Sequence, residues 1–474
     1  MGKKRENLNA IIFAIVAIVI IVVFLVMVFF NSGIAIKFAN GAEVEGEKVS
    51  ATELNFYYNY ELNNFLNENG DYISYLGLDP YSSLKDQKCT IVEDMTWHDY
   101  FMEQARQSMS DIYTLSAQAR ANGFKLTEED YAELQGTRDY FEASAISSGY
   151  TMNSYLRNAY GKGVNEKVFM DVITEQYLAD AYQSQKISEI GAQITEDEIN
   201  TYFDEHANDY EMVSYRSFLV VSGTATDEDD ASKSEKIKTA EAVAKEMVAN
   251  IKTEQDFIDQ AYENAAEENK ATYEKDDATL YTNTMTYLTS VEGEDYQWLS
   301  ADNRKAGQVT YVPVGDNFRV LMYLGSELDD APGSADVTMV MVNIENKDVD
   351  AARAEMDAIV AEYEADPTYE NFKSLVAKGD PQFTEDGVME GLTVNSFGVN
   401  AVDEWVFADD RQAGDTEVIE GVNAVYFVYV NEVEPNWHYS SHTELTRAAF
   451  NEWFEALSSD DSVVLLPGSR YVGR

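Results

Sequence analysis

Histidine is the side chain best suited to acid–base chemistry and metal binding near neutral pH, and this 474-residue chain has only four. His98 and His206 stand apart, whereas His438 and His442 are four residues apart and would share one face of a helix. Two histidines at that spacing can bind a metal, but no third ligand with a fitting spacing is present. We therefore predict a packing or surface role for the pair and no metal site.

The other side chains with chemical potential are equally sparse. Cys89 is the only cysteine, which excludes an internal disulfide, and a lone thiol most often acts as a small buried apolar group. The acidic run at 227–230 lacks the glycine and the spaced ligands of a calcium loop, so a solvated loop is expected. The chain has no nucleophile elbow, phosphate-binding loop or cysteine–histidine pair. We expect no cofactor, and these motifs identify no catalytic residue.

The charge balance excludes one class of partner. With 85 acidic and 34 basic residues, the formal net charge is −51, so nucleic acid is excluded because phosphate contacts need clustered Lys and Arg. Acidic chains are often disordered, but 45% hydrophobic and 12% aromatic residues are enough for packed cores. The composition predicts folded domains with an acidic surface.

Residues 11–30 form an apolar stretch without a charged side chain. As a helix it would span about 30 Å, the thickness of a bilayer core. Lys3, Lys4 and Arg5 precede it, so the positive-inside rule predicts a cytoplasmic N-terminus and an external remainder. A cleaved signal peptide is the alternative, although the apolar region is longer than usual and no clear cleavage site follows.

A segment that begins with tryptophan occurs twice, at 298–307 and at 405–414. Six positions match between the copies: tryptophan, alanine, aspartate, arginine, alanine and glycine. Each copy leads into a stretch rich in β-branched and aromatic residues, at 318–323 and 425–430, which predicts a strand. Two copies are too few for a solenoid, so they indicate two copies of one small domain.

Helix-start signals of one kind mark the part of the chain before these copies. Ser50, Thr127 and Thr195 each stand three residues before an acid, and such pairs satisfy the free amides of a first helical turn. The period changes to that of a strand at 213–221. The same order of strand, helices and tryptophan segment restarts after a predicted linker at 328–336.

This order of elements resembles the extracytoplasmic foldases and chaperones of the SurA and PrsA group, in which a helical chaperone domain flanks parvulin-type prolyl isomerase modules. The segments at 42–50, 121–129 and 194–203 look like recurring segments of that group. The repeated tryptophan unit is similar to the C-terminal half of a parvulin module. The resemblance covers nearly all of the chain after the apolar stretch.

The resemblance implies a fold class and a domain order. The class is α+β multidomain, with an N-terminal transmembrane helix, a helical SurA-N-like chaperone domain and two parvulin-like modules. The expected parts are a basic cytoplasmic N-terminus at 1–10, the transmembrane helix at 11–30, the helical domain at 42–210, modules at 211–328 and 336–434, and a C-terminal helix and tail at 435–474.

The resemblance also says where chemistry would lie. Parvulins place an apolar proline pocket beside two histidines, one on the first strand of the module and one on the last. The matching first-strand positions are Ser217 and Met339, and the last-strand positions are approximately Phe318 and Val425. Residues 207–437 contain no histidine, and Asp380 is the one acid that hints at the family site. The family histidines are missing, so isomerase activity is doubtful and catalytic residues stay unknown.

The predicted function is a membrane-anchored extracytoplasmic foldase or chaperone in a bacterial cell membrane, single-pass through residues 11–30. Its partners would be unfolded or newly exported polypeptides, bound on apolar and tyrosine-rich surfaces of the helical domain. The negative charge would favour cation-rich clients. Two alternatives remain open: an active peptidyl-prolyl cis-trans isomerase, and a non-enzymatic envelope scaffold that holds a fixed partner.

Overall fold

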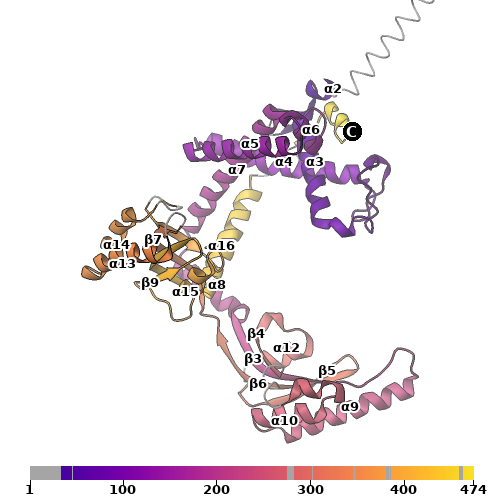
Figure 1. Ribbon diagram of the computed structural model, residues 1–474. Helices are drawn as coiled ribbons and strands as arrows, with labels where there is room; N and C mark the ends of the chain where they lie inside the picture. The colour runs from indigo at the N-terminus through magenta and orange to yellow at the C-terminus, as the bar shows by residue number, and fades with distance from the viewer. Residues whose placement is uncertain are drawn as a thin grey trace, which may run out of the picture. The chain divides into compact units, whose positions relative to one another are not determined.

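A computed structural model describes residues 34–473, except 45, 275–281, 302, 345–347, 381–383, 385 and 458–462 (Figure 1). The chain divides into two compact units. The first unit combines Met1–Gln193 with Thr446–Arg474, and the second is the intervening Ile194–Leu445.

The first unit is mainly helical. Its elements are α2 (Ile34–Lys37), β1 (Asn40–Val44), β2 (Glu47–Ser50), α3 (Ala51–Asn69), α4 (Trp97–Ala121), α5 (Glu128–Ser147), α6 (Met152–Tyr160), α7 (Glu166–Gly191), β11 (Val463–Leu465) and η7 (Pro467–Tyr471). Helix α16 (Asn436–Glu455) begins in the second unit and ends in the first.

The predicted helix starts are confirmed. Ser50, Thr127 and Thr195 are the N-caps of α3, α5 and α8 (Glu196–His206), and each forms a complete capping box. In each box the hydroxyl accepts a hydrogen bond from the backbone amide three residues on, and the acid there accepts one from the amide of the cap. Two otherwise free amides are thereby satisfied at each helix start.

The two ends of the described chain meet in one three-stranded antiparallel sheet of the first unit, in the order β11-β1-β2. Val44 pairs with Val463, and Ala42 pairs with Leu465. Val463 and Val472 are buried in the same core as the rings of α3, α4 and α7. The C-terminal residues therefore complete the core that the N-terminal helices begin.

The core of the first unit is rich in aromatic side chains. Phe56 of α3, Trp97 and Phe101 of α4, and Phe169 of α7 are all at most 2% exposed. Trp97 and Phe101 stack with ring centres 5.8 Å apart. These rings each bury a large apolar area and make a large contribution to stability, so most aromatics of this part of the chain are core.

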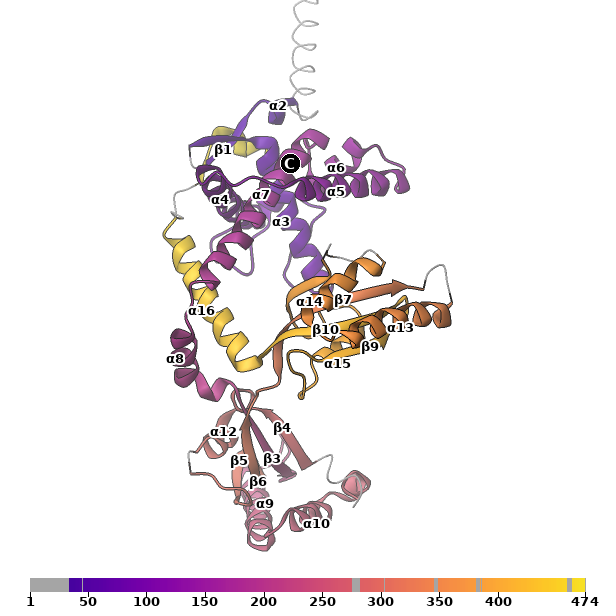
Figure 2. The same ribbon diagram turned by 90° about the vertical axis from the view of Figure 1, so that its left-hand side faces the viewer.

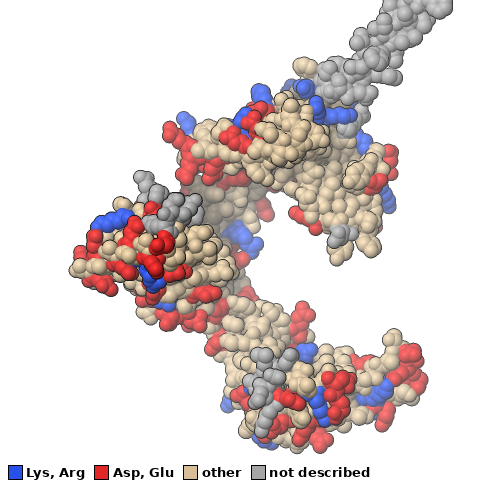
Figure 3. Space-filling view, viewed as in Figure 1, with Lys and Arg blue, Asp and Glu red and all other residues tan. Residues whose placement is uncertain are grey.

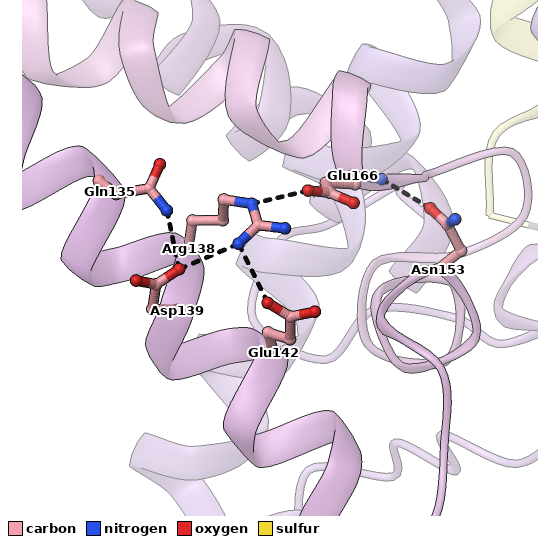
Figure 4. A network of polar contacts seen from close by, with 6 residues as sticks. All are labelled: Gln135, Arg138, Asp139, Glu142, Asn153 and Glu166. Carbon is pink, nitrogen blue, oxygen red and sulfur yellow. Dashed lines mark hydrogen bonds and ion pairs between the residues drawn. The ribbon is translucent and has the colours of Figure 1, made fainter.

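Arg138 on α5 is the centre of a polar network (Figure 4). Its guanidinium contacts Glu166, at the start of α7, at 2.7 Å. It also contacts Asp139 and Glu142 of its own helix at 2.9 and 3.0 Å. The amide of Glu166 donates to Asn153 of α6 at 2.9 Å. The network joins α5, α6 and α7, and we assign it a structural role.

The predicted fold class and location need a correction. Among the described residues, no helix is long and apolar enough to cross a membrane. The longest ones, α4 with 25 residues and α7 with 26, carry charged side chains along their lengths, which a bilayer core does not tolerate. The expected span at 11–30 lies outside the described residues. Over the described residues, the observed class is mixed α+β without a membrane-spanning helix, and the predicted single-pass membrane location is withdrawn.

The second unit contains two four-stranded antiparallel sheets of the same topology (Figures 1 and 2). The elements of the first module, residues 211–328, are β3 (Glu211–Val220), α9 (Asp230–Asn250), α10 (Glu254–Asn264), η4 (Glu267–Tyr273), β4 (Asn283–Tyr287), η5 (Leu288–Ser290), α12 (Gly293–Leu299), β5 (Val309–Val314) and β6 (Asn317–Leu328). Those of the second, residues 332–435, are β7 (Pro332–Asn343), α13 (Val349–Ala365), α14 (Tyr369–Leu375), η6 (Val376–Lys378), β8 (Val388–Leu392), α15 (Asn400–Val406), β9 (Thr416–Glu420) and β10 (Ala424–Pro435).

Each sheet is covered on both faces. In the first module the order is β4-β3-β6-β5, with α9 and α10 on one face and α12 on the other (Figure 1). In the second the order is β8-β7-β10-β9, with α13 and α14 on one face and α15 on the other. The sequence repeat is therefore a structural repeat of one α+β fold.

The repeated tryptophan and arginine form the same local structure in both modules. The guanidinium carbon of Arg304 lies 4.0 Å from the ring centre of Trp298, and that of Arg411 lies 4.2 Å from Trp405. Each arginine Nε also donates to the carbonyl of its own tryptophan at 2.9 Å. The arginine thus closes the turn after the short helix by stacking and hydrogen bonding.

The repeated glycine joins this turn to the sheet. The amide of Gly307 donates to the carbonyl of Tyr323 on β6, and that of Gly414 donates to Val430 on β10, both at 2.8 Å. Both glycines have positive φ, 82° and 94°, a conformation that costs other residues free energy. The repeated segment is therefore scaffold, and the site must be sought elsewhere.

Candidate functional site

The register of the two sheets places the four strand positions that the sequence singled out, Ser217, Phe318, Met339 and Val425. Val220 pairs with Phe318 in the first module, and Val342 pairs with Val425 in the second. The two copies thus keep one register. Ser217, two positions after the buried Tyr215, lies on the face covered by α12, because side chains alternate along a strand.

The last-strand position read from the sequence therefore moves by one residue in each module. Phe318 packs in the core on the α9 face, opposite to the face of Ser217. Val425 likewise belongs to the core under α13, whereas Met339 belongs to the core under α15. The last-strand residues that share a face with Ser217 and Met339 are the next ones along, Arg319 and Tyr426.

In the first module this face carries a charged pair. Arg319 of β6 forms an ion pair with Asp295 of α12, whose side chain is only 6% exposed. Burial and the nearby carboxylate of Asp295 raise the pKa of Tyr215. Among the described residues of this module, only two partly exposed apolar side chains, Tyr296 and Trp298, pack on the core here. Polar and aromatic side chains therefore cover this face of the first module.

In the second module the same face is apolar. Met339 and Tyr426 replace Ser217 and Arg319, and both are buried in the core under α15. Eight partly exposed apolar side chains pack on that core, which we call the methionine–aromatic face: Met341, Met389, Leu392, Phe397, Val399, Trp405, Phe407 and Val433. Flexible methionines and rings of this kind adapt to varied apolar partners. This face is the candidate binding site.

A loop between η6 and β8 supports the first strand under this face. A Cβ on Gly387 would lie 2.5 Å from the carbonyl oxygen of Met339, and one on Gly379 would lie 2.7 Å from that of Met341. The carbonyl of Gly387 accepts a hydrogen bond from the amide of Met339 at 2.9 Å. The two glycines let the loop approach β7 closely and fix the strand that carries Met341.

Asp380, the acid expected in this region, has a backbone role. Its amide donates to the carbonyl of Met341 at 2.8 Å, and its carboxylate accepts from the amide of Asn343 at 2.7 Å. It therefore holds the end of β7 through these two backbone contacts.

His98 and His206 make core and local contacts. His98 is buried and lies 3.1 Å from the hydroxyl of Tyr58 through Nδ1. His206 contacts the carbonyl of Tyr202 in its own helix at 2.8 Å. His442 lies on α16, as does His438. Over the residues described, no group of three or more potential ligands could hold a metal ion.

The thiol and the acidic run are also part of the structure. Cys89 is buried in the core of the first unit. Asp229 caps α9 by accepting from the amides of Ala231 and Ser232, at 3.1 and 3.0 Å. The acidic run is thus a helix cap with its flanking loop.

His438 joins two elements of the second unit. Its Nε2 lies 3.0 Å from Glu196 of α8, and its Nδ1 lies 2.5 Å from Glu434 of β10. Partial burial opposes the charged form, but the hydrogen bonds to the two carboxylates outweigh it and raise the pKa of His438. When protonated, His438 can donate to both carboxylates and so links α16 to the start of α8 and to β10.

We expect this bridge to make stability depend on pH. A raised folded pKa gives stabilisation that is full below the unfolded pKa, near 6.5, and lost as pH rises through the folded value. His438→Gln should therefore cost about 1 kcal/mol in mildly acidic solution and little in mildly alkaline solution, because partial exposure screens the pairing. Urea denaturation at both pH values measures this. His206→Gln is the control, and an equal cost at both pH values would refute the bridge.

Comparison with known proteins gives limited similarity. No protein-family profile matches the sequence, and no curated protein sequence matches it significantly. Among solved structures, the foldase protein PrsA from Streptococcus pneumoniae aligns over 64% of this chain and 97% of its own, at 11% identity and a TM-score of 0.20. PrsA from Bacillus subtilis covers 64% and 96%, at 14% identity and a TM-score of 0.16. The foldase protein PrsA from Lactococcus lactis covers 74% and 94%, at 11% identity and a TM-score of 0.19. TM-scores this low do not establish a shared overall arrangement.

Proposed function

We propose that this chain is a foldase-type chaperone that binds apolar segments of incompletely folded polypeptides through the methionine–aromatic face. The observation that carries the proposal is the difference between the two modules. One fold presents an ion pair on this face in the first copy and eight partly exposed apolar side chains in the second. Clustered, partly exposed apolar side chains are typical of surfaces that bind proteins or peptides.

Binding is favoured over catalysis on chemical grounds. Prolyl isomerisation must lower a barrier of about 18–20 kcal/mol that arises from amide resonance. The face offers Met339 and Tyr426 where the family would place histidines, and Tyr426 is buried, which raises the pKa of its hydroxyl. Pocket shape would be the remaining source of barrier reduction. We expect no acceleration of the slow phase in a proline-limited refolding assay.

The binding role is tested by placing charge on the face. Met341→Glu combined with Met389→Glu should weaken protection of an aggregating unfolded client by about tenfold or more, because burial of the exposed part of each methionine by a client contributes on the order of 1 kcal/mol. The measurement is the chaperone concentration that halves light scattering of a chemically denatured client.

A matched control comes from the first module. Met285 lies on β4, the edge strand that corresponds to β8, and is 49% exposed. Met285→Glu should leave protection unchanged. Thermal unfolding of both variants checks that they fold. Full protection by the folded double variant would rule out this face as the binding site.

A further inference from the structure

The segment between α3 and α4 exposes three tyrosines in succession. Tyr72, Tyr75 and Tyr81 are 69%, 85% and 97% exposed. Tyr72 and Tyr75 contact each other with ring centres 6.5 Å apart. We call residues 70–96 the tyrosine lobe. Three large rings so fully exposed in one short segment are unusual, and clustered exposed rings indicate a binding surface.

The lobe is held to the rest of the first unit on its inner side. Leu78, Leu84 and Cys89 are buried in the aromatic core. The side chain of Gln87 accepts from the amide of Asp79 at 2.8 Å and donates to the carbonyl of Asp79 at 2.9 Å. The tyrosines therefore project from an anchored backbone, so a partner needs to order only their side chains.

An ionised carboxylate lies beside the most exposed ring. Asp79 accepts from the hydroxyl of Ser82 at 2.6 Å and from the amide of Tyr81 at 3.0 Å. These two hydrogen bonds lower the pKa of Asp79. The turn that presents Tyr81 thus also presents a fixed negative charge.

The charges of the lobe and its borders are mostly negative. Five carboxylates are exposed here, those of Glu68, Asp79, Asp86, Glu93 and Asp94, whereas Lys88 is exposed and Lys85 only in part. The space-filling view shows Asp and Glu spread over much of the drawn surface (Figure 3). A partner that meets this surface must therefore be cationic to be attracted.

The described residues place no Lys or Arg side chain over the rings of the lobe. Elsewhere Lys186 lies over the ring of Trp453 at 5.4 Å, and Arg470 lies over Tyr471 at 4.8 Å. Within the described part of the chain, no such partner is found over Tyr72, Tyr75 or Tyr81. Each ring keeps a face that can accept an ammonium or guanidinium group, best where a carboxylate lies near.

We propose that the tyrosine lobe is a subsite for Lys- and Arg-rich segments of client polypeptides. Their cationic groups lie over the tyrosine rings and beside the carboxylates of the lobe. This inference rests on the proposed chaperone function and extends it, since it names a class of client and a second place of binding, separate from the methionine–aromatic face.

The test is a peptide-binding measurement on the whole chain. The probe is a short fluorescent peptide of alternating Arg and Ser, read by anisotropy, and its counterpart has citrulline in place of Arg. Tyr75→Ser combined with Tyr81→Ser should weaken binding of the Arg peptide about fivefold to tenfold. Tyr75→Phe with Tyr81→Phe should keep the affinity, because the ring faces remain. Added salt should weaken binding of the Arg peptide.

The matched control uses Tyr140 of α5 and Tyr150, three residues after the end of that helix, which are 69% and 50% exposed. Tyr140→Ser with Tyr150→Ser should leave Arg-peptide binding unchanged. Equal binding by the parent and the Tyr75/Tyr81 serine variant, or equal binding of the Arg and citrulline peptides, would overturn the proposal.

Failure of this inference is distinguishable from failure of the proposed function. A client without Lys or Arg clusters should be protected equally by the parent and by the Tyr75/Tyr81 serine variant, and less by the Met341→Glu, Met389→Glu variant. That pattern without Arg-peptide binding would refute the lobe alone. Protection of no client by the parent would refute the chaperone function itself.

Discussion

Val472→Asp should unfold the first unit at temperatures where the parent is stable, although residue 472 lies near the end of the chain. Val472 is fully buried in the core that Trp97 and Phe101 share. An uncompensated carboxylate at such a site costs about 3–5 kcal/mol. Circular dichroism of the helical signal during thermal denaturation measures the loss.

Val464 provides the control for this prediction. It lies in β11, in the same C-terminal segment, but is 55% exposed. Val464→Asp should change the unfolding temperature little, because surface substitutions usually stay within about 0.5 kcal/mol. If both variants unfold alike, the C-terminal segment does not contribute to this core in the way described.

Gly387→Ala should strongly destabilise the second module. The new Cβ would lie 2.5 Å from the carbonyl oxygen of Met339 and 2.9 Å from a methyl group of Val376, at a φ of +68°. The left-handed conformation costs about 1–2 kcal/mol for a residue with a Cβ, and forced overpacking adds about 1–3 kcal/mol. Chemical denaturation measures the sum, and hydrogen exchange of β7 locates it.

Gly391 separates the two contributions. Its φ is +63°, yet a Cβ there would meet nothing within 4 Å. Gly391→Ala should therefore cost only the conformational part, about 1–2 kcal/mol. Equal losses in the two variants would mean that the close approach to Met339 has no energetic weight.

Local signals made part of this fold predictable. The N-caps at Ser50, Thr127 and Thr195 satisfy amides within three residues, so sequence alone locates those helix starts. The strands after each tryptophan segment were also predictable, because β-branched and aromatic residues cluster there. The observed strands β6 and β10 extend beyond the predicted ranges, since pairing with β3 and β7 lengthens them.

Long-range pairing was not predictable in the same way. The predicted linker at 328–336 is short, because β7 begins at Pro332 and pairs with the far end of β10. The face of the last-strand position also escaped prediction, since a slip of one residue moves a side chain to the other face. Arg319, one residue after the approximate position Phe318, shares the face of Ser217 and pairs with Asp295. Nothing in the short strand Val463–Leu465 indicates β1 as its partner.

For the candidate site, the sequence predicted only that the histidines of a catalytic site are missing. The absence of histidine from residues 207–437 argued against catalysis. The methionine–aromatic face combines residues from β7, β8, α15 and the adjoining loops. They are scattered over about a hundred positions of sequence, where no single spacing rule connects them. The difference between the equivalent faces of the two modules is what identifies the methionine–aromatic face.

The pairing of β1 with β11 has a consequence for the order of folding during synthesis. A ribosome delivers β1 before β11, with the whole of Ile194–Leu445 in between. Both sheets of the second unit can pair as soon as β10 has emerged, whereas the first unit must wait with an open strand edge and an incomplete aromatic core. Such a half-finished core is prone to aggregate. We therefore expect the nascent first unit to depend on other chaperones until β11 has been synthesised.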